Sequence, residues 1–478
     1  MPSFSDVAFY CDGYGIFRLC LFPGRSFVNA PASMPRAVFT EGSPMRHVLV
    51  MTGAGSIGLV AAFMVDFLSL LYVSRLNNPH MTAAVGFSSQ VLFFPISIEI
   101  GFSIGIGAVV SRTIGAGNRA LARQLAASGL VLVAFLLVIL VMAVLPFVEG
   151  ILTFAGARDE TLEIGTRYLA ITLPSMIFLG LAMALASLLR AVGDPRRSMY
   201  VTLGGGIVTA MLDPLFIFVF GLGVEGAAIV VLISRFACMV VGLHGAVLRH
   251  NLVGQPKLRA IGGDVRPIFY VAVPAILTNL AAPVANLYSL RIAATFGETI
   301  VAAFALIDRL TPLAFGVLYA LSGSVGPIMA QNLGACLPHR VRRTLTDCLI
   351  VAAVYTLVIW AVLWISAPWL AALFAVSGET RHLLIYFCTY GGMLWLFLGG
   401  IFVANAAFNN LGFPFLSTFF NWGRATLGTM PFVALGAHRF GATGIIMGMT
   451  VGAALFGLGA MATAYLVTGR LAKAPRDA

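Results

Sequence analysis

The amino-acid sequence predicts an all-α polytopic membrane protein, with about twelve transmembrane helices in two pseudo-symmetric six-helix lobes. The first reason is composition. Of the 478 residues, 60% are hydrophobic and 10% are charged, whereas water-soluble domains carry about 25% charged residues. The second reason is a succession of apolar runs, each long enough to cross a hydrocarbon core of about 30 Å. The third is that the chain repeats itself.

The internal repeat has a register of 219 residues. Gly193 and Pro195 recur as Gly412 and Pro414, since 412 minus 193 is 219. A register that holds over most of the chain indicates an internal duplication. With six crossings in each copy, both copies enter the membrane in the same sense, so we expect an axis of pseudo-symmetry along the membrane normal. The same shift relates further pairs, among them Gly107 and Gly326, and Gly115 and Gly334.

The apolar runs define the expected spans and domains. The spans lie near 48–76, 81–111, 122–146, 163–189, 197–220, 225–248, 267–296, 299–331, 343–367, 382–410, 414–436 and 441–468. We therefore expect an N-terminal tail at 1–45, a first lobe at 46–249, an inter-lobe linker at 250–266, a second lobe at 267–469 and a C-terminal tail at 470–478.

Basic residues indicate the topology. Arg112, Arg119 and Arg123 flank one short loop, Arg190, Arg196 and Arg197 flank the next loop on that side, and further basic groups follow at 249–266, 340–343 and 470–476. The positive-inside bias places these loops, the linker and both termini in the cytoplasm. Because these residues are not gathered on one face, the net charge of +11 does not indicate nucleic-acid binding. We expect a monomer in the inner (plasma) membrane of a bacterium.

Two acidic residues stand out in apolar spans of the first lobe. Asp66 lies in the first span, and Asp213 lies directly before Pro214 in the fifth. Both are near 12 to 15 Å from the outer surface at a rise of 1.5 Å per residue. A carboxylate at membrane depth is costly and is by default a functional residue. We expect the two acids to share one cavity, where burial and mutual repulsion favour protonation; the alternative is that each packs against a neighbouring hydroxyl.

Residues near Asp213 bear on the coupling ion. A sodium site needs several hard oxygen ligands; Thr209, one turn before Asp213, offers one, and Val231 offers none. Arg235, at a similar depth on the next span, either pairs with Asp213 or faces the cavity between the lobes. Both alternatives disfavour sodium.

Further charges lie inside spans, and Arg424 in the eleventh span is one of them. Glu99, near the middle of the second span, either lines the transport pathway or hydrogen-bonds to a neighbouring helix. Arg291 and Asp308 fall at comparable depths on adjacent spans, and we interpret them as a structural ion pair. We expect no metal site and no cofactor.

The order and spacing of several motifs resemble the multidrug and toxic compound extrusion (MATE) family. These motifs are SRTIGAGN at 111–118, LRAVGD at 189–194, LDPL at 212–215 and GLGVEGAA at 221–228, and the resemblance covers residues 48–469. It implies a two-lobed bundle of twelve helices that opens alternately to each side and exports organic, often cationic and lipophilic, compounds against a proton or sodium gradient.

Within that family the chain is most similar to the DNA-damage-inducible (DinF-like) branch. The resemblance implies that Asp66 and Asp213 are the cation site of the first lobe. Thr209 stands where the family has Asn, Val231 where it has Thr, and Arg235 where Gln is common. These departures favour coupling to protons over coupling to sodium.

Other functions have less support. A lipid-linked precursor or polysaccharide flippase of the wider superfamily is the nearest alternative, and several arginines in a central cavity would favour it. A membrane-embedded enzyme needs a nucleophile with a base or a metal cluster, but the histidines are scattered and neither HExxH nor GxSxG occurs. A receptor has no positive support. The sequence therefore predicts a transporter of small organic molecules.

Overall fold

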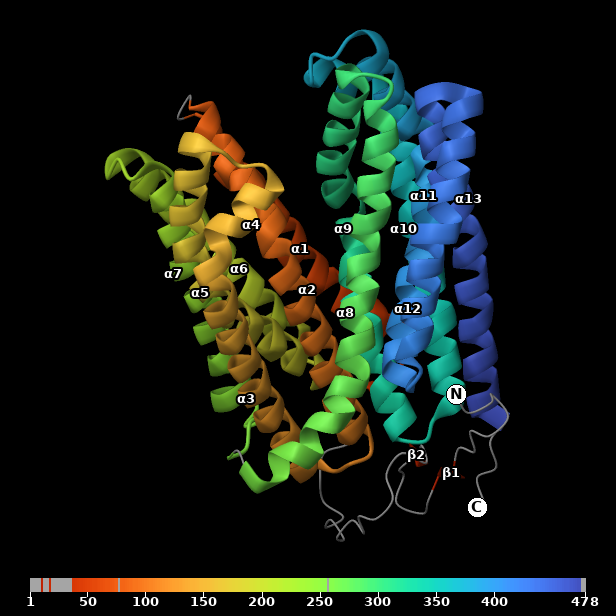
Figure 1. Cartoon of the computed structure of the whole chain (residues 1–478). Helices are drawn as coiled ribbons and strands as arrows, with labels where there is room; N and C mark the ends of the chain where they lie inside the picture. The colour runs from red at the N-terminus through yellow and green to blue at the C-terminus, as the bar shows by residue number, and fades with distance from the viewer. Residues whose placement is uncertain (1–9, 12–16, 19–36, 76–77, 256–257, 474–478) are drawn as a thin grey trace. The chain divides into compact units, whose positions relative to one another are not determined.

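The computed structural model describes residues 10–11, 17–18, 37–75, 78–255 and 258–473, and nearly all of them are helical (Figure 1). The first half contains strands β1 (Tyr10–Cys11) and β2 (Phe17–Arg18), the 3-10 turn η1 (Val38–Thr40), and helices α1 (Pro44–Ser74), α2 (Pro79–Gly115), α3 (Arg119–Val144), α4 (Val148–Ala155), α5 (Asp159–Ala191), α6 (Pro195–Pro214) and α7 (Gly223–Leu243). The second half contains α8 (Leu258–Ala294), α9 (Glu298–Gly334), α10 (Pro338–Leu373), α11 (Gly378–Leu411), α12 (Pro414–Gly423) and α13 (Met430–Lys473).

Shorter elements interrupt or join these helices. A 3-10 turn at Leu145–Phe147 joins α3 to α4. Three π-helical turns lie at Leu215–Val219, His244–Arg249 and Arg424–Thr429. The antiparallel pair of β1 and β2 is two residues long on each side. Within the described residues, eleven helical stretches are long and apolar enough to cross a membrane.

The last of these stretches, Pro414–Ala472, is a hairpin of two crossings. Gly441 inside α13 has φ 65° and ψ −147°, a conformation essentially restricted to glycine. Close backbone approaches pair Gly436 with Gly444 and Gly428 with Gly452. Each pair is symmetric about position 440, which is the pattern of two antiparallel arms. The described residues therefore provide twelve helical stretches long enough to cross a membrane, and the predicted all-α fold is confirmed.

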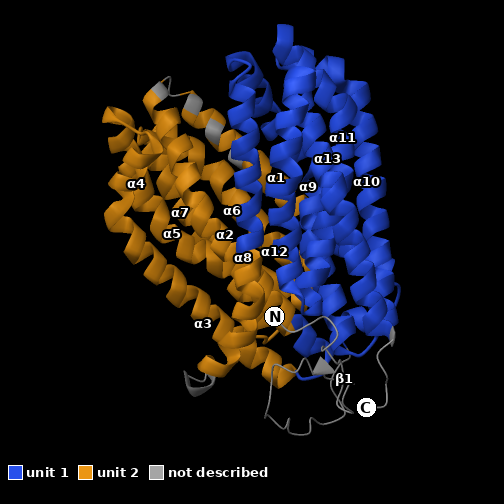
Figure 2. Ribbon diagram, turned by 45° about the vertical axis from the view of Figure 1, so that its right-hand side comes forward, with its two compact units in different colours: residues 1–56, 111–118, 277–478 blue, residues 57–110, 119–276 orange. Residues whose placement is uncertain are grey.

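The described chain divides into two compact units (Figure 2). One unit contains residues 57–110 and 119–276, and the other contains residues 1–56, 111–118 and 277–478. These boundaries differ from the expected lobes, because residues up to 56 and residues 111–118, which include the end of α2, group with the C-terminal half. The expected linker at 250–266 is helical from Leu258 onward.

Polar contacts account for the grouping of the N-terminal segment. The backbone N–H of Phe39 donates to Oε1 of Gln331 at 3.0 Å, and Nη2 of Arg340 donates to the carbonyl oxygen of Phe39 at 3.0 Å. Phe39 itself is buried. This part of the expected N-terminal tail is therefore docked on α9 and α10.

Small residues allow close packing in the unit of residues 57–110 and 119–276. Gly205 of α6 lies against Ser234 and Cys238 of α7, and Gly242 of α7 lies against Leu185 of α5. In a bilayer, apolar burial does not drive helices together, so helix association depends on close van der Waals packing. Small residues permit that packing. The helices α5, α6 and α7 are thereby held around the charged residues described next.

Candidate functional site

Asp213 is enclosed by protein at the end of α6. Its side chain is 1% exposed. Pro214, which follows it, cannot donate a backbone hydrogen bond to the carbonyl four residues earlier. The backbone widens directly afterward into the π-helical turn Leu215–Val219, a feature often found at functional sites.

The carboxylate of Asp213 contacts α1. The hydroxyl of Ser69 donates a short hydrogen bond to Oδ2 of Asp213. Asp66 occupies α1 three residues earlier, but its side chain lies outside the described residues. Since residues three apart are neighbours on a helix surface, the fold brings backbone position 66 to the level of this contact. Whether the two acids share a cavity therefore stays a prediction.

Thr209 lies one turn before Asp213 and is buried. Its hydroxyl donates to the carbonyl oxygen of Gly205 at 3.1 Å, and the hydroxyl of Ser234 in α7 donates to the same carbonyl at 2.9 Å. The bond from Ser234 joins α7 to α6, whereas the bond from Thr209 stays within α6.

Arg235 in α7 is bonded to α5. Its Nη1 donates to Oγ of Ser175 at 2.7 Å and to the carbonyl oxygen of Thr172 at 3.4 Å. Neither of these partners is Asp213. Arg235 is half-buried.

Glu99, the acidic residue of α2, is 1% exposed. Its side chain packs over Gly180 of α5, where a larger residue would leave no room. Among the residues that the structure describes, neither carboxyl oxygen has a hydrogen-bond partner. An ionised carboxylate without partners is costly in an apolar interior, so this arrangement favours the neutral form. Of the two alternatives for Glu99, the hydrogen bond to a neighbouring helix is not formed among the described residues.

Arg291 and Asp308 do not form the expected ion pair in the described part of the chain. Both side chains are exposed. Similar depth is not enough for pairing, because two residues at one level can point to different sides of their helices.

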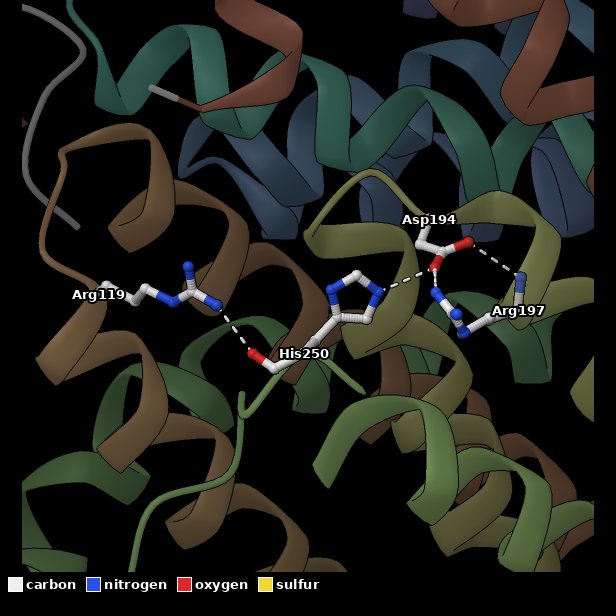
Figure 3. A network of polar contacts seen from close by, with 4 residues as sticks. All are labelled: Arg119, Asp194, Arg197 and His250. Carbon is white, nitrogen blue, oxygen red and sulfur yellow. Dashed lines mark hydrogen bonds and ion pairs between the residues drawn. The ribbon is translucent and has the colours of Figure 1, made fainter. Parts of the chain in front are cut away.

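A polar network at the other end of the first bundle was not predicted as a site (Figure 3). Asp194 precedes α6 and accepts hydrogen bonds from the backbone N–H of Arg197 at 3.1 Å, from Nη1 of Arg197 at 2.6 Å and from Nε2 of His250 at 2.8 Å. Nη2 of Arg119 donates to the carbonyl oxygen of His250 at 2.8 Å. Partial burial raises the pKa of Asp194, but the bonds from His250 and Arg197 outweigh it and leave the pKa below its ordinary value. The Asp-Pro pair, an N-cap signal, marks Asp194 in the sequence; nothing marks His250.

The sequence profile of the MatE family matches this chain twice, over residues 56–215 and residues 274–435. The two matches begin 218 residues apart, since 274 minus 56 is 218, which agrees with the internal repeat. A duplicated all-helical bundle with charged residues buried inside its spans defines a polytopic membrane transporter. The chain belongs to the MatE family, the family that its motifs resemble.

Relatives and solved structures agree with this family. The chain is 27% identical to the FAD transporter of Shewanella oneidensis over 428 residues, which cover 87% of this chain and 93% of the relative. It is 25% identical to the multidrug export protein MepA of Staphylococcus aureus over 429 residues, which cover 87% and 92%. An outward-facing multidrug resistance MATE family transporter of the MOP superfamily superposes with a TM-score of 0.87 at 22% identity, covering 93% of this chain and all of that chain. The bent form of the Vibrio cholerae MATE transporter VcmN superposes with a TM-score of 0.85 at 23% identity, covering 90% and 98%.

Proposed function

We propose that this chain is a secondary active antiporter that exports organic compounds, lipophilic or cationic ones among them, by alternating access coupled to proton entry. The observation that carries the proposal is the enclosed carboxylate of Asp213 and its hydrogen bond from Ser69 across α6 and α1. In this proposal Asp66 and Asp213 form the proton site, as in the DinF-like branch that the sequence resembles. We also place the chain in a bacterial inner membrane, with both termini cytoplasmic and the monomer as the working unit.

The proposed coupling acts through the contact with α1. A carboxylate can only accept hydrogen bonds, whereas a carboxylic acid can donate one as well. Protonation of Asp213 therefore removes a buried charge and changes the bond that holds Ser69, which alters the packing of α1. For a proton gradient to drive export, this change must favour one conformation over the other by a few kcal/mol. Substrate then leaves on the side from which the proton arrives.

The names of two relatives indicate classes of substrate to test. One is named for multidrug export and one for FAD, which is a large organic anion. Coupling to sodium remains the second candidate for the ion, and transport of a lipid-linked precursor the second candidate for the substrate. The deep arginines Arg235 and Arg424 favour the flippase alternative more than any other residues do.

Purified protein in proteoliposomes tests the proposal, with a lipophilic cation as substrate and with proton and sodium gradients imposed separately. We expect uptake under the proton gradient alone, and loss of most of it in Asp66→Asn and Asp213→Asn. Glu163→Gln is the control, because Glu163 is an exposed acid of α5. Wild-type rates in both Asn variants under a proton gradient, or uptake that only sodium drives, would refute the proton site.

A further inference from the structure

Arg424 is a buried cation in the C-terminal unit. It begins the π-helical turn Arg424–Thr429 and is 8% exposed. It lies ten residues after Pro414, where α12 begins, which is about 15 Å along the helix and so near the middle of a core of about 30 Å. A guanidinium at this depth cannot lose its charge, because arginine stays protonated in proteins.

The described residues do not neutralise this charge. No aspartate or glutamate among them forms an ion pair with Arg424, although six other ion pairs are described. The Nε atom is enclosed and has no hydrogen-bond partner in the described part of the chain. A lipid-facing arginine extends its side chain to the interface, but Arg424 is enclosed by protein. Its position therefore calls for an anion from outside the chain.

Side-chain hydrogen bonds between α12 and α11 hold the backbone next to Arg424. Nδ2 of Asn421 donates to Oδ1 of Asn405 in α11 at 2.9 Å, and Oγ of Ser417 donates to Oδ1 of Asn409 at 3.1 Å. Ser417, Asn421 and Arg424 follow one another at helical spacing, so they lie on one face. The hydroxyl of Thr429 also donates to the carbonyl oxygen of Arg424 at 2.9 Å. The guanidinium is thus carried by a fixed backbone.

We propose that Arg424 forms a subsite for an organic anion, with a carboxylate or phosphate group of the ligand at the guanidinium. Guanidinium matches both anionic groups through paired N–H donors. This inference rests on the proposed function, because it names a class of substrate for the same exporter. The proposal gives the C-terminal unit a positively charged binding residue, whereas the proposed proton site in the other unit consists of carboxylates.

The test compares two forms of one ligand. Binding of a xanthene dye with a free carboxylate, and of the same dye as its ethyl ester, is measured by fluorescence polarisation on purified wild-type protein, Arg424→Gln and Arg424→Lys. Arg291→Gln is the matched control, because Arg291 is an exposed arginine of the same unit. We expect Arg424→Gln to weaken binding of the carboxylate dye at least about 10-fold, the range of a hydrogen bond to a charged group, and to leave the ester within about twofold. Arg424→Lys should retain more of the affinity than Arg424→Gln, and Arg291→Gln all of it.

Retained ester binding shows that Arg424→Gln is folded. If Arg424→Gln binds the carboxylate dye as the wild type does, or weakens both dyes equally, the anion subsite is refuted. If only Arg424→Lys folds, equal loss of both dyes in that variant refutes it as well. Uptake under a proton gradient separates the two proposals: uptake of both dyes at rates that do not depend on Arg424 overturns the subsite alone, whereas absence of uptake for both dyes overturns the proposed function too.

Discussion

The hydroxyl of Ser69 in α1 donates a hydrogen bond to the buried carboxylate of Asp213 in α6. This bond joins two helices at the residue that the sequence marks most strongly, beside Pro214. A charged acceptor strengthens a hydrogen bond, and a buried carboxylate that loses its donor retains the full cost of desolvation. The bond is therefore sensitive both to protonation of Asp213 and to the position of α1.

Ser69→Ala is expected to lower the free energy of unfolding by about 1 to 3 kcal/mol, because it removes a donor from a buried acid. We also expect slower uptake under a proton gradient. Thermal unfolding and proteoliposome uptake measure the two effects. Ser89→Ala is the control, since the exposed hydroxyl of Ser89 bonds only within its own helix, to the carbonyl of Val85. Equal behaviour of the two variants would contradict the role given to Ser69.

Glu99 and Asp264 are both buried acids, but they differ in their hydrogen-bond partners. Glu99 has no hydrogen-bond partner among the described residues, whereas Asp264 accepts bonds from Gln124 at 2.8 and 3.1 Å and from Ser128 at 2.9 Å. Replacing an unpartnered buried polar group by an apolar one of similar size leaves the free energy of unfolding unchanged or raises it. Breaking a network whose hydrogen bonds are all made lowers the free energy of unfolding.

We therefore expect Glu99→Met to raise thermal stability, or leave it unchanged, and Asp264→Leu to lower the free energy of unfolding by about 1 to 3 kcal/mol. Thermal unfolding in one detergent compares both variants with the wild type. A large loss of stability in Glu99→Met would mean that Glu99 has a partner that the wild-type structure does not describe. If Glu99 also lies on the proton route, the variant will be stable but slow under a proton gradient.

The spans were predictable because each crossing needs about 20 apolar residues in a row, a signal that survives without any knowledge of packing. The hairpin within Pro414–Ala472 was predictable for the same reason, although the chain reverses at Gly441 without leaving helical structure for long. Asp213 was predictable because a carboxylate before a proline is costly at that depth.

Partnerships between side chains were not predictable in the same way. Depth along a helix places Arg291 near Asp308, but the direction of each side chain around its helix decides whether they meet, and in the structure they do not. Ser69 and Ser175 give no signal, since serine is common in apolar spans and its role appears only when the opposite helix is placed. The docking of Phe39 on Gln331 joins residues 292 positions apart, which no local pattern indicates.

Asp194→Asn tests the network at the start of α6. The pKa of Asp194 lies below its ordinary value, so its bonds stabilise the fold fully at pH values above the ordinary aspartate pKa, and the contribution is lost as pH falls through the lowered pKa. We expect the variant to be less stable than the wild type by about 1 kcal/mol near pH 7, since Asn still caps the helix but cannot pair with Arg197. The difference should shrink below pH 4. Thermal unfolding at both pH values measures it, with the exposed Asp159→Asn as control; a difference that grows in acid would be inconsistent with the network.

The hairpin around Gly441 leads to a test of close packing. A Cβ atom at Gly444 would overlap the carbonyl oxygen of Gly436, and one at Gly452 would overlap that of Gly428. Each overlap forces the two arms apart, so Gly444→Ala and Gly452→Ala should each lower the free energy of unfolding by about 1 to 3 kcal/mol, the usual range for overpacking. Gly469→Ala is the control, because a Cβ there meets no described atom within 4 Å, and in a helix alanine is favoured over glycine by about 1 kcal/mol. Thermal unfolding in detergent should therefore show two destabilised variants and one that equals or exceeds the wild type; three similar melting temperatures would mean that the arms of the hairpin do not approach at these glycines.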